Sequence, residues 1–299
     1  MIRILFISIA ILTLLSSKCS DVESSETIVI SDSNFKFSYD LNEPNSSFFL
    51  TSELKEISGL SCSLDDQYLY AINDELANLY ILDIQTAEIK DKVDFGKPDD
   101  YEGMCMVDDF VYIVESNGNL KVVDPKSKKR VASYDCSLSK KNNIEGLAYD
   151  ASTKRLLLAA KGNSKLDGHK KGKRSIFSIP TFDYKVEKKP YLSLDMKKRF
   201  EALVQKKSEE VDDKMKSRIG DFAPSGLAIH PSTKDLYILS ARGQTLTIVN
   251  SEGHLQAVVF LSQNSNPQPE GICFDRNGTL YISNEGVTGK GRIASFVMN

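Results

Sequence analysis

The chain has no tryptophan, 3 histidines and 5 cysteines among its 299 residues. Aromatic packing must therefore rest on 14 Phe and 12 Tyr. The odd number of cysteines argues against a simple disulfide framework. His169, His230 and His254 lie in turns or insertions and form no recognisable catalytic arrangement. The sequence also lacks a Gly-x-Ser-x-Gly elbow and a phosphate-binding glycine loop, so neither of these motifs indicates an activity.

A strong charge of either sign is also missing. The chain has 38 Lys and Arg against 41 Asp and Glu, for a formal net charge of −3. This balance gives no electrostatic drive toward nucleic acid, and no nucleic-acid partner is expected. Hydrophobic residues make up 41% and charged residues 26% of the chain. These values are typical of a globular protein and exclude wholesale disorder.

The longest apolar run is near the beginning of the sequence. Ile4 to Leu15 is a run of about 12 largely apolar residues, which as a helix would span about 18 Å, too short for a bilayer. Arg3 precedes the run and Cys19 follows it closely. Residues 1–18 are therefore predicted to be a signal peptide resembling those of bacterial lipoproteins, with Cys19 as the lipidated residue. Lys18 departs from that pattern, and the alternative is an ordinary secretory signal followed by an incidental cysteine.

Residues 19–38 are expected to form an acidic tether. They begin with the polar stretch Ser20-Asp-Val-Glu-Ser-Ser-Glu26, which is typical of a flexible linker. Together with the signal, this stretch predicts a protein of the cell envelope that is attached to a membrane through a lipid. The outer membrane or the cell surface is the expected location.

The rest of the chain repeats itself. A glycine followed by a short apolar run, a turn and a second apolar run occurs five times, at Gly59, Gly103, Gly146, Gly226 and Gly271. The turns are rich in Asp, Asn and Gly, as hairpin turns are. Short antiparallel strands at a period of about 40 to 45 residues are the signature of β-propeller blades.

We therefore predict an all-β chain in which residues 39–299 form a β-propeller. The repeats favour five blades, and a sixth built from Thr27 to Tyr39 and degenerate sequence remains open. The last repeat lacks an outer strand, which Ser47 to Leu54 can supply, so that no sheet edge is left free. The long interval between the third and fourth repeats indicates an insertion, and residues 195–221 within it show helical apolar periodicity.

Three of the remaining cysteines follow repeated glycines by two or three residues: Cys62, Cys105 and Cys273. Equivalent positions in separate repeats indicate small, buried core residues. A disulfide is compatible with an oxidising compartment, but the repeat pattern favours free thiols. No spacing of cysteine and histidine predicts a zinc site.

Two stretches carry a family resemblance. They are Tyr39-Asp-Leu-Asn-Glu-Pro44 through Glu53-Leu-Lys-Glu-Ile-Ser-Gly-Leu60, and Ala71-Ile-Asn-Asp-Glu75. With the later Tyr-Glu-Gly and Pro-Glu-Gly-Ile motifs, they resemble the SdiA-regulated family of propeller proteins over about residues 39–297. The Glu-Gly-hydrophobic motifs are shared more distantly with NHL, SMP-30-like and esterase-like phytase propellers. The resemblance implies an exported, often membrane-anchored propeller of poorly defined activity.

Propellers bind ligands at a mouth of the central channel, so equivalent positions near the axis are candidate site residues. The residue before each repeated glycine is Ser or Glu, and polar or charged residues follow most of the second strands. The predicted ligand-binding residues are Asp74, Glu75, Glu102, Glu115, Glu145, Lys161, Arg242, Glu270, Asn284 and Glu285.

Crowded carboxylates raise one another's pKa values unless a positive charge lies between them. Lys161 and Arg242 are one source of positive charge. A hard cation such as Ca²⁺ is another, with Glu102, Glu145 and Glu270 as candidate ligands. In the SMP-30-like propellers, such an ion polarises a lactone or ester carbonyl. The alternative role of these Glu side chains is structural, as braces between blades.

The leading functional hypothesis is a lipid-anchored, exported propeller that binds a small molecule or a protein partner at an acidic channel mouth, with Ca²⁺ as the candidate cofactor. One alternative is a metal-dependent hydrolase of lactones, esters or phosphoesters. A second alternative is a protein-interaction scaffold that uses the propeller rim and the helical insertion. Whether the chain is an enzyme stays open at this point.

Overall fold

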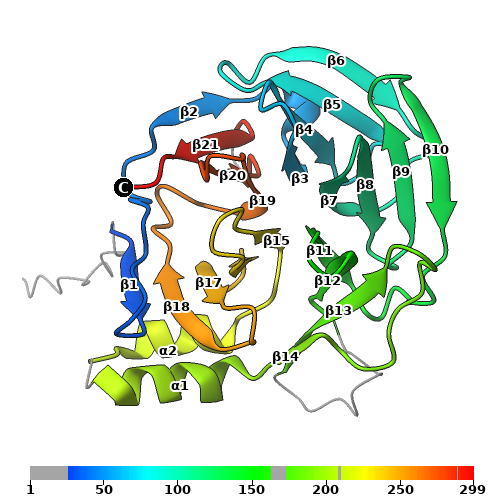
Figure 1. Cartoon of the computed structure of the whole chain (residues 1–299). Coiled ribbons are helices and arrows are strands. Elements are labelled where there is room, and N and C mark those ends of the chain that lie inside the picture. The colour runs from blue at the N-terminus through cyan, green and yellow to red at the C-terminus, as the bar shows by residue number, and fades with distance from the viewer. Residues whose placement is uncertain (1–25, 163–172, 208–209, 288) are drawn as a thin grey trace, which may run out of the picture.

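The computed structural model describes residues 26–162, 173–207, 210–287 and 289–299. The strands form five antiparallel sheets, and these are arranged around a central axis as the blades of a propeller (Figure 1). The all-β, five-bladed fold predicted from the repeats is confirmed. The proposed signal peptide (1–18) and Cys19 lie outside the described residues. Within the described ranges, none of the helices has the length and apolarity to cross a membrane.

Each blade begins with its innermost strand and proceeds outward. Blade 1 contains β3 (Ile57–Cys62), β4 (Tyr68–Asn73), β5 (Asn78–Asp83) and β6 (Ile89–Asp94). Blade 2 contains β7 (Tyr101–Val107), β8 (Phe110–Glu115), β9 (Leu120–Asp124) and β10 (Lys129–Tyr134). Blade 3 contains β11 (Ile144–Asp150), β12 (Arg155–Ala160), β13 (Arg174–Pro180) and β14 (Leu192–Leu194).

Blades 4 and 5 each take one strand from the N-terminal part of the chain. Blade 4 contains β15 (Gly226–Ile229), β16 (Leu236–Ser240), β17 (Thr245–Val249) and β18 (Leu255–Phe260), and β1 (Ile28–Ser31) pairs with β18. Blade 5 contains β19 (Pro269–Phe274), β20 (Leu280–Asn284) and β21 (Arg292–Phe296), and β2 (Ser46–Phe49) pairs with β21. In Figure 1, β2 in blue lies beside β21 in red.

The N-terminal segment therefore closes the ring, as the short last repeat predicted. The closing strand lies at Ser46–Phe49, and Ser52–Leu54 forms a 3₁₀ turn instead of continuing it. β1 falls within the segment that was expected to be a tether. The folded part of the chain thus begins before residue 39.

Tyr39 anchors the connection between β1 and β2. Its hydroxyl donates a hydrogen bond to the carbonyl oxygen of Gly278 at 2.7 Å and lies 2.9 Å from Nε2 of His230. Nδ1 of His230 accepts from the backbone N–H groups of Ser232 and Thr233, so Nε2 carries the proton of a neutral ring. Burial lowers the pKa of His230, which favours this neutral form.

Glycine allows the five innermost strands to approach one another closely. A Cβ on Gly226 would lie 2.3 Å from the carbonyl oxygen of Glu270, and one on Gly103 would lie 2.8 Å from the backbone nitrogen of Leu147. No larger residue fits unless the neighbouring strand moves. The channel between these strands is consequently narrow and encloses about 10 Å³ at the level of the glycines, roughly the space of one water molecule.

Five hydrophobic clusters hold the ring together, one at each seam between neighbouring blades. The seam between blades 5 and 1, for example, buries Leu60, Leu69 and Tyr281 together with Cys62 and Cys273. Apolar burial in these seams stabilises the ring, because a single sheet cannot cover both of its own faces.

The insertion forms two helices where one was expected over residues 195–221. They are α1 (Met196–Lys207) and α2 (Asp213–Gly220). α2 has its own N-cap, because the side chain of Asp212 accepts a hydrogen bond from the backbone N–H of Met215 at 2.7 Å. A local capping signal thus separates α2 from α1 within one stretch of helical periodicity.

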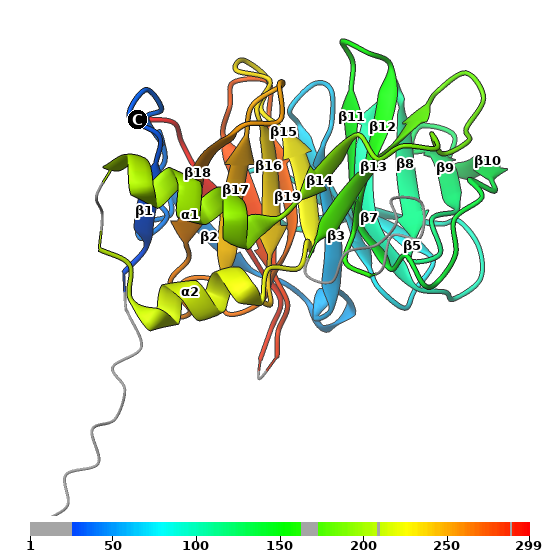
Figure 2. The same ribbon diagram turned by 90° about the horizontal axis from the view of Figure 1, so that it is seen from below.

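The two helices lie across the strands of blade 4 (Figure 2). Their apolar side chains, including Phe200, Leu203 and Ile219, are buried in the cluster that also contains Phe260. Arg218 fixes α2 in place, since its guanidinium donates to the carbonyl oxygen of Leu261 at 2.8 Å and lies over the Phe260 ring. The insertion is therefore a packed part of the propeller wall.

Replacing Gly226 by Ala should destabilise the protein by roughly 2 kcal/mol or more, because the added methyl group overlaps the carbonyl of Glu270 and forces β15 away from β19. Gly289→Ala is the matched control, since a Cβ at Gly289 meets no atom within 4 Å. Urea unfolding of both variants measures the difference. Equal stabilities would contradict the close approach of the innermost strands.

Candidate functional site

Four of the five innermost strands are irregular at the same place, the residue before the repeated glycine. Ladder pairing passes over Ser58, Glu102 and Glu145, and it is interrupted around Glu270 in blade 5. A bulged residue is released from the ladder and its side chain is redirected. All four residues line the channel, as does Ser225 of blade 4. The repeats thus place the five residues that precede the repeated glycines at one end of the channel. We call these five residues the aligned column.

The two serines of this column are braces between blades. Ser58 Oγ donates to the carbonyl oxygen of Tyr101 at 2.8 Å, and Ser225 Oγ donates to the carbonyl oxygen of Pro269 at 2.8 Å. Each bond joins one blade to the innermost strand of the next. The bracing role considered for the Glu side chains is therefore performed in the structure by the serines.

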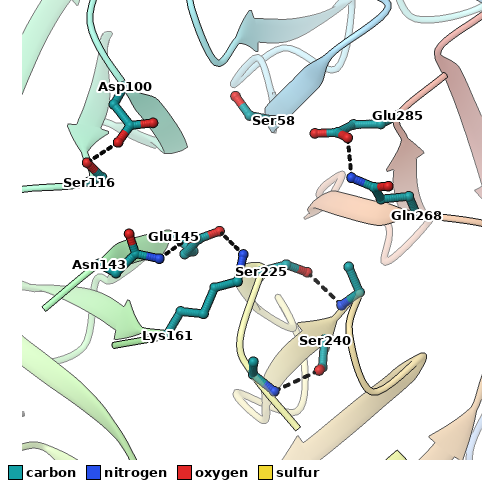
Figure 3. A network of polar contacts seen from close by, with 12 residues as sticks. Ser58, Asp100, Ser116, Asn143, Glu145, Lys161, Ser225, Ser240, Gln268 and Glu285 are labelled. Carbon is teal, nitrogen blue, oxygen red and sulfur yellow. Dashed lines mark hydrogen bonds and ion pairs between the residues drawn. The ribbon is translucent and has the colours of Figure 1, made fainter. Parts of the chain in front are cut away.

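Glu145 and Lys161 form the ion pair of this channel end. Lys161 Nζ lies 3.0 Å from Glu145 Oε2, and Asn143 donates to the other carboxyl oxygen (Figure 3). Glu145 is only 5% exposed. Burial alone would lower the pKa of the Lys161 ammonium, but Glu145, together with Glu270 and Glu102, raises it above its usual value. Lys161 is therefore held in its charged form.

The other carboxyls lie near this pair, and among the described residues none of them has a cation of its own. Burial, with repulsion from Glu145, raises the pKa of Glu102 to about 9. Burial, with repulsion from Glu285, raises that of Glu270 to about 8. Glu285 in turn reaches about 7 through burial and repulsion from Asp74. We call the end of the channel formed by Asp74, Asp100, Glu102, Glu145, Glu270 and Glu285 the acidic mouth.

Asp74 completes this chain of repulsions. Burial, with repulsion from Glu56 and Glu75, raises its pKa to about 6. One of its carboxyl oxygens, Oδ1, is buried and has no hydrogen-bond partner among the residues that the structure describes. Lys161 is a positive charge that opposes the rise in the pKa values of Glu102, Glu145, Glu270 and Glu285. Within the described part of the chain, the acidic mouth therefore has more carboxyls than the Lys161 ammonium can neutralise.

The structure places other predicted site residues elsewhere. Glu115 forms an ion pair with Lys121 of the adjacent strand at 2.7 Å, and its side chain is 3% exposed. Arg242 was expected to neutralise the carboxyls, but its side chain is 67% exposed and lies 3.8 Å from Asp221, which follows α2. Glu115 is held within its own blade because it pairs across the sheet. Arg242 instead lies at the surface beside the end of the helical insertion.

Two further predicted residues shape the surrounding loops. Glu75 is exposed at the rim, where its backbone N–H donates to Asn73 Oδ1 at 2.8 Å. Asn284 is 1% exposed and donates from Nδ2 to Asn266 Oδ1 at 3.3 Å. Both residues lie next to the acidic mouth in sequence, but their contacts serve the turn and the blade interior.

Sequence reasoning missed the polar residues that support the carboxyls. Asp100 accepts a hydrogen bond from Ser116, Asn143 donates to Glu145, and Gln268 donates to Glu285 (Figure 3). Asp100, Asn143 and Gln268 each stand two residues before a Glu of the aligned column. The repeat alignment contained this second column, which would have identified all three.

The carboxyls do not form one compact ligand set. Across the described ranges, no three Asp, Glu, His or Cys side chains are grouped closely enough to hold a metal ion. Lys161 lies among the carboxyls that were candidate ligands. The candidate metal ligands are therefore interleaved with an ammonium group and are not gathered around one point.

Part of the chain matches a known family model. Residues 181–287 match the family described as SdiA-regulated. The predicted resemblance to this family is confirmed over that range, which contains the Pro-Glu-Gly-Ile motif, whereas the opening motifs at residues 39–75 lie outside it. The part of the chain similar to the SdiA-regulated family contains the helical insertion, blade 4 and the Glu270 and Glu285 carboxyls, while Glu102, Glu145 and Lys161 lie outside it. No curated protein matches the sequence.

Several solved structures are similar in part to this chain. Hydrazine synthase from Kuenenia stuttgartiensis is 14% identical, with 81% of this chain and 83% of that chain covered and a TM-score of 0.49. A nidogen/laminin complex is 13% identical, with 79% and 74% covered and a TM-score of 0.48. A streptogramin B lyase is 11% identical, with 85% and 97% covered and a TM-score of 0.48. Similarities at this level say nothing about what the present chain binds.

The stability of the protein should fall as the pH rises from about 7 to 9. The pKa values of about 9 for Glu102 and about 8 for Glu270 lie above the ordinary value of 4.5. The folded state therefore holds protons that the unfolded chain has already released. The contribution of these protons to the free energy of unfolding is lost as the pH rises through the folded pKa values. The variant Glu102→Gln/Glu270→Gln should show a flatter pH profile and melt above wild type at pH 9.

The control for this profile is Glu201→Gln/Glu252→Gln, which removes the same charge from two exposed side chains. It should follow the wild-type pH profile. Thermal melting at closely spaced pH values is the measurement, and a wild-type melting temperature that stays level between pH 7 and 9 would show that the two carboxyls are not perturbed.

Proposed function

We propose that this chain is a binding protein whose acidic mouth takes a ligand through a positively charged group. The observation that supports the proposal is the excess of carboxyls over cations among the described residues of this channel end. Carboxyls from blades 1, 2, 3 and 5 surround the channel end, and Lys161 is the ammonium that acts on them. Such an arrangement costs free energy in the unliganded protein and is typical of functional sites.

Lys161 indicates the chemistry that the mouth accepts. Its ammonium bonds to Glu145 at 3.0 Å while about a third of the side chain, 36%, stays exposed. An ammonium or guanidinium group of a ligand would find the same charge-assisted hydrogen bonds at Glu102, Glu270 and Glu285. Its arrival would favour the ionised form of these carboxyls and release protons, so affinity should rise with pH.

Calcium is the alternative cation. It prefers carboxylate oxygens, and Glu102, Glu145 and Glu270 are the residues that would hold it. Because these carboxyls are not grouped as ligands in the structure, Ca²⁺ would have to draw them together. We therefore place an organic cation first and test both.

The test is a thermal-shift titration at pH 8 with two probes, CaCl₂ and spermidine. A ligand that binds only the folded state should raise the melting temperature by several degrees at about 100 times its Kd. The response should vanish in Glu102→Gln/Glu270→Gln and persist in Glu201→Gln/Glu252→Gln. A response to spermidine alone identifies the organic cation, and one to CaCl₂ alone identifies the metal. No response to either probe would refute the proposal.

Lys161→Met sharpens the same test. It removes the internal cation that competes with the ligand and leaves a side chain of similar length. Cation affinity, measured by calorimetry, should therefore rise by about tenfold, the equivalent of one pKa unit. An unchanged affinity would mean that the ligand does not share the Lys161 environment.

Two alternatives draw on the same structure. The metal-dependent hydrolase is favoured by Glu285, whose pKa of about 7 suits a general base. Hydrolysis of a lactone or ester, lost in Glu102→Gln/Glu270→Gln, would indicate it. The scaffold alternative is left with the outward faces of α1 and α2, because Phe200, Leu203 and Ile219 are buried against blade 4.

We also propose that Cys19 attaches the propeller to a membrane through a lipid. The support is the signal-like start of the sequence, with Cys19 after the apolar run. Cys19→Ser should move the protein from the membrane fraction to the soluble fraction and abolish incorporation of a labelled fatty acid. Ser20→Ala should leave both unchanged. A wild-type protein that is already soluble and unlabelled would favour the ordinary secretory signal.

A further inference from the structure

The opposite end of the channel differs chemically from the acidic mouth. It opens into a cavity of about 210 Å³ at the far ends of the innermost strands, and Cys62, Cys105 and Cys273 are among the residues that line it. The Sγ atoms of Cys62 and Cys273 are 3.4 Å apart. These two residues belong to β3 and β19, the innermost strands of the first and last blades.

The backbones of β3 and β19 hold the two thiols at this position. A Cβ on Gly271 would lie 2.9 Å from Cβ of Leu60 and 3.1 Å from its backbone nitrogen, so the strands are in close contact there. Two residues further along each strand stand Cys273 and Cys62. The approach of the thiols therefore follows from strand register as well as from the side-chain rotamers.

The other four seams do not repeat this pair. The same offsets from the repeated glycines place there Met106 with Ser61, Tyr149 with Cys105, Ile229 with Ala148, and Phe274 with Ala228. Of the five seams, the one that closes the ring is thus the one with two thiols face to face.

We propose that Cys62 and Cys273 form a disulfide bond that closes the propeller covalently. A low-molecular-weight or protein disulfide is the oxidant: a Cys thiolate attacks it, one of its sulfurs leaves as a thiolate, and the second Cys resolves the mixed disulfide. Two electrons and two protons pass from the pair to the oxidant, which becomes two thiols. Both cysteines are among the residues that line the cavity, which is the route by which the oxidant would reach them. The sulfurs need to approach from 3.4 Å to about 2.05 Å.

The surroundings suit a structural bond better than a reactive one. The hydrogen bond with Cys273 and burial raise the pKa of the Cys62 thiol, with Asp275 and Asp66 adding to the effect. A thiol that resists ionisation is a weak nucleophile, so the bond should form slowly at neutral pH and exchange little afterwards. The two side chains are 8% and 7% exposed. The bond also spans 211 residues, and cross-links across long loops restrict the unfolded chain most.

The disulfide needs an oxidising compartment, which the export proposed above provides, but its chemistry can be tested without it. The protein is isolated from whole cells under acid quench, and a second sample is incubated with oxidised glutathione at pH 8.5. Beyond Cys19 the chain has four free cysteines in the structure. After oxidation, two of these should titrate under denaturing conditions, and tryptic mapping should show the Cys62 peptide joined to the Cys273 peptide.

Reduction should lower the melting temperature by roughly 5 °C or more, since the cross-link closes so long a loop. Cys105→Ser, which changes a thiol lining the same cavity, should retain both the bond and this shift. Cys62→Ser and Cys273→Ser should lose both. If either variant fails to fold, differential alkylation of the wild-type protein decides the question without it.

Four titratable thiols after oxidation, or a link from Cys62 or Cys273 to Cys105, would overturn the proposal. A bond formed by oxidised glutathione but missing from the sample taken from whole cells would support the pairing and count against export. The experiment thereby distinguishes an error in the proposed Cys62–Cys273 pairing from an error in the proposed export. Neither outcome depends on cation binding at the acidic mouth.

Discussion

The close approach of five innermost strands is the constraint on which the rest of this structure depends. Glycine at Gly103, Gly146, Gly226 and Gly271 lets an innermost strand meet the backbone of a neighbouring one, and the channel between the strands encloses about 10 Å³. Whatever stands beside these glycines is then crowded against its counterparts in other blades. At one end this crowds carboxyls, and at the other it brings Cys62 to 3.4 Å from Cys273. Both proposed properties therefore originate from one packing requirement.

The carboxyls show how such crowding is tolerated. Two positions of the column hold serine, which donates to a neighbouring backbone carbonyl and needs no charge. The remaining three hold Glu, and there Lys161, Asn143 and Gln268 supply donors while retained protons relieve the rest of the repulsion. A fold optimised only for stability would have extended the serines around the ring, because burial of an unpaired carboxyl is unfavourable. The presence of Glu at these positions is the strongest reason to propose that the acidic mouth binds a ligand.

The repeats could be read from the sequence because each blade obeys the same local rules, and the blade count and the strand supplied by the N-terminal segment followed from them. Side-chain destinations were harder to predict. Glu115 and Glu145 both belong to aligned columns, yet Glu115 pairs with Lys121 within its blade while Glu145 reaches the mouth through a bulge. Arg242 lies beside Asp221 and away from the mouth, and the position of Asp221 depends on how the insertion packs. The pairing of Cys62 with Cys273 was not predicted, because the two residues lie 211 positions apart. The pattern within one repeat does not indicate which residues of neighbouring blades face each other.

The use of β2 as the outer strand of the last blade has a consequence for the timing of synthesis. Residues 46–49 are translated long before their partner strand at 292–296. Until then blade 5 is incomplete, both edges of the open ring are exposed, and the seam between β3 and β19 does not exist. A chain translocated across a membrane during or after synthesis would thus keep an open ring until blade 5 had crossed. The ring would then close on the far side, where Cys62 and Cys273 first meet.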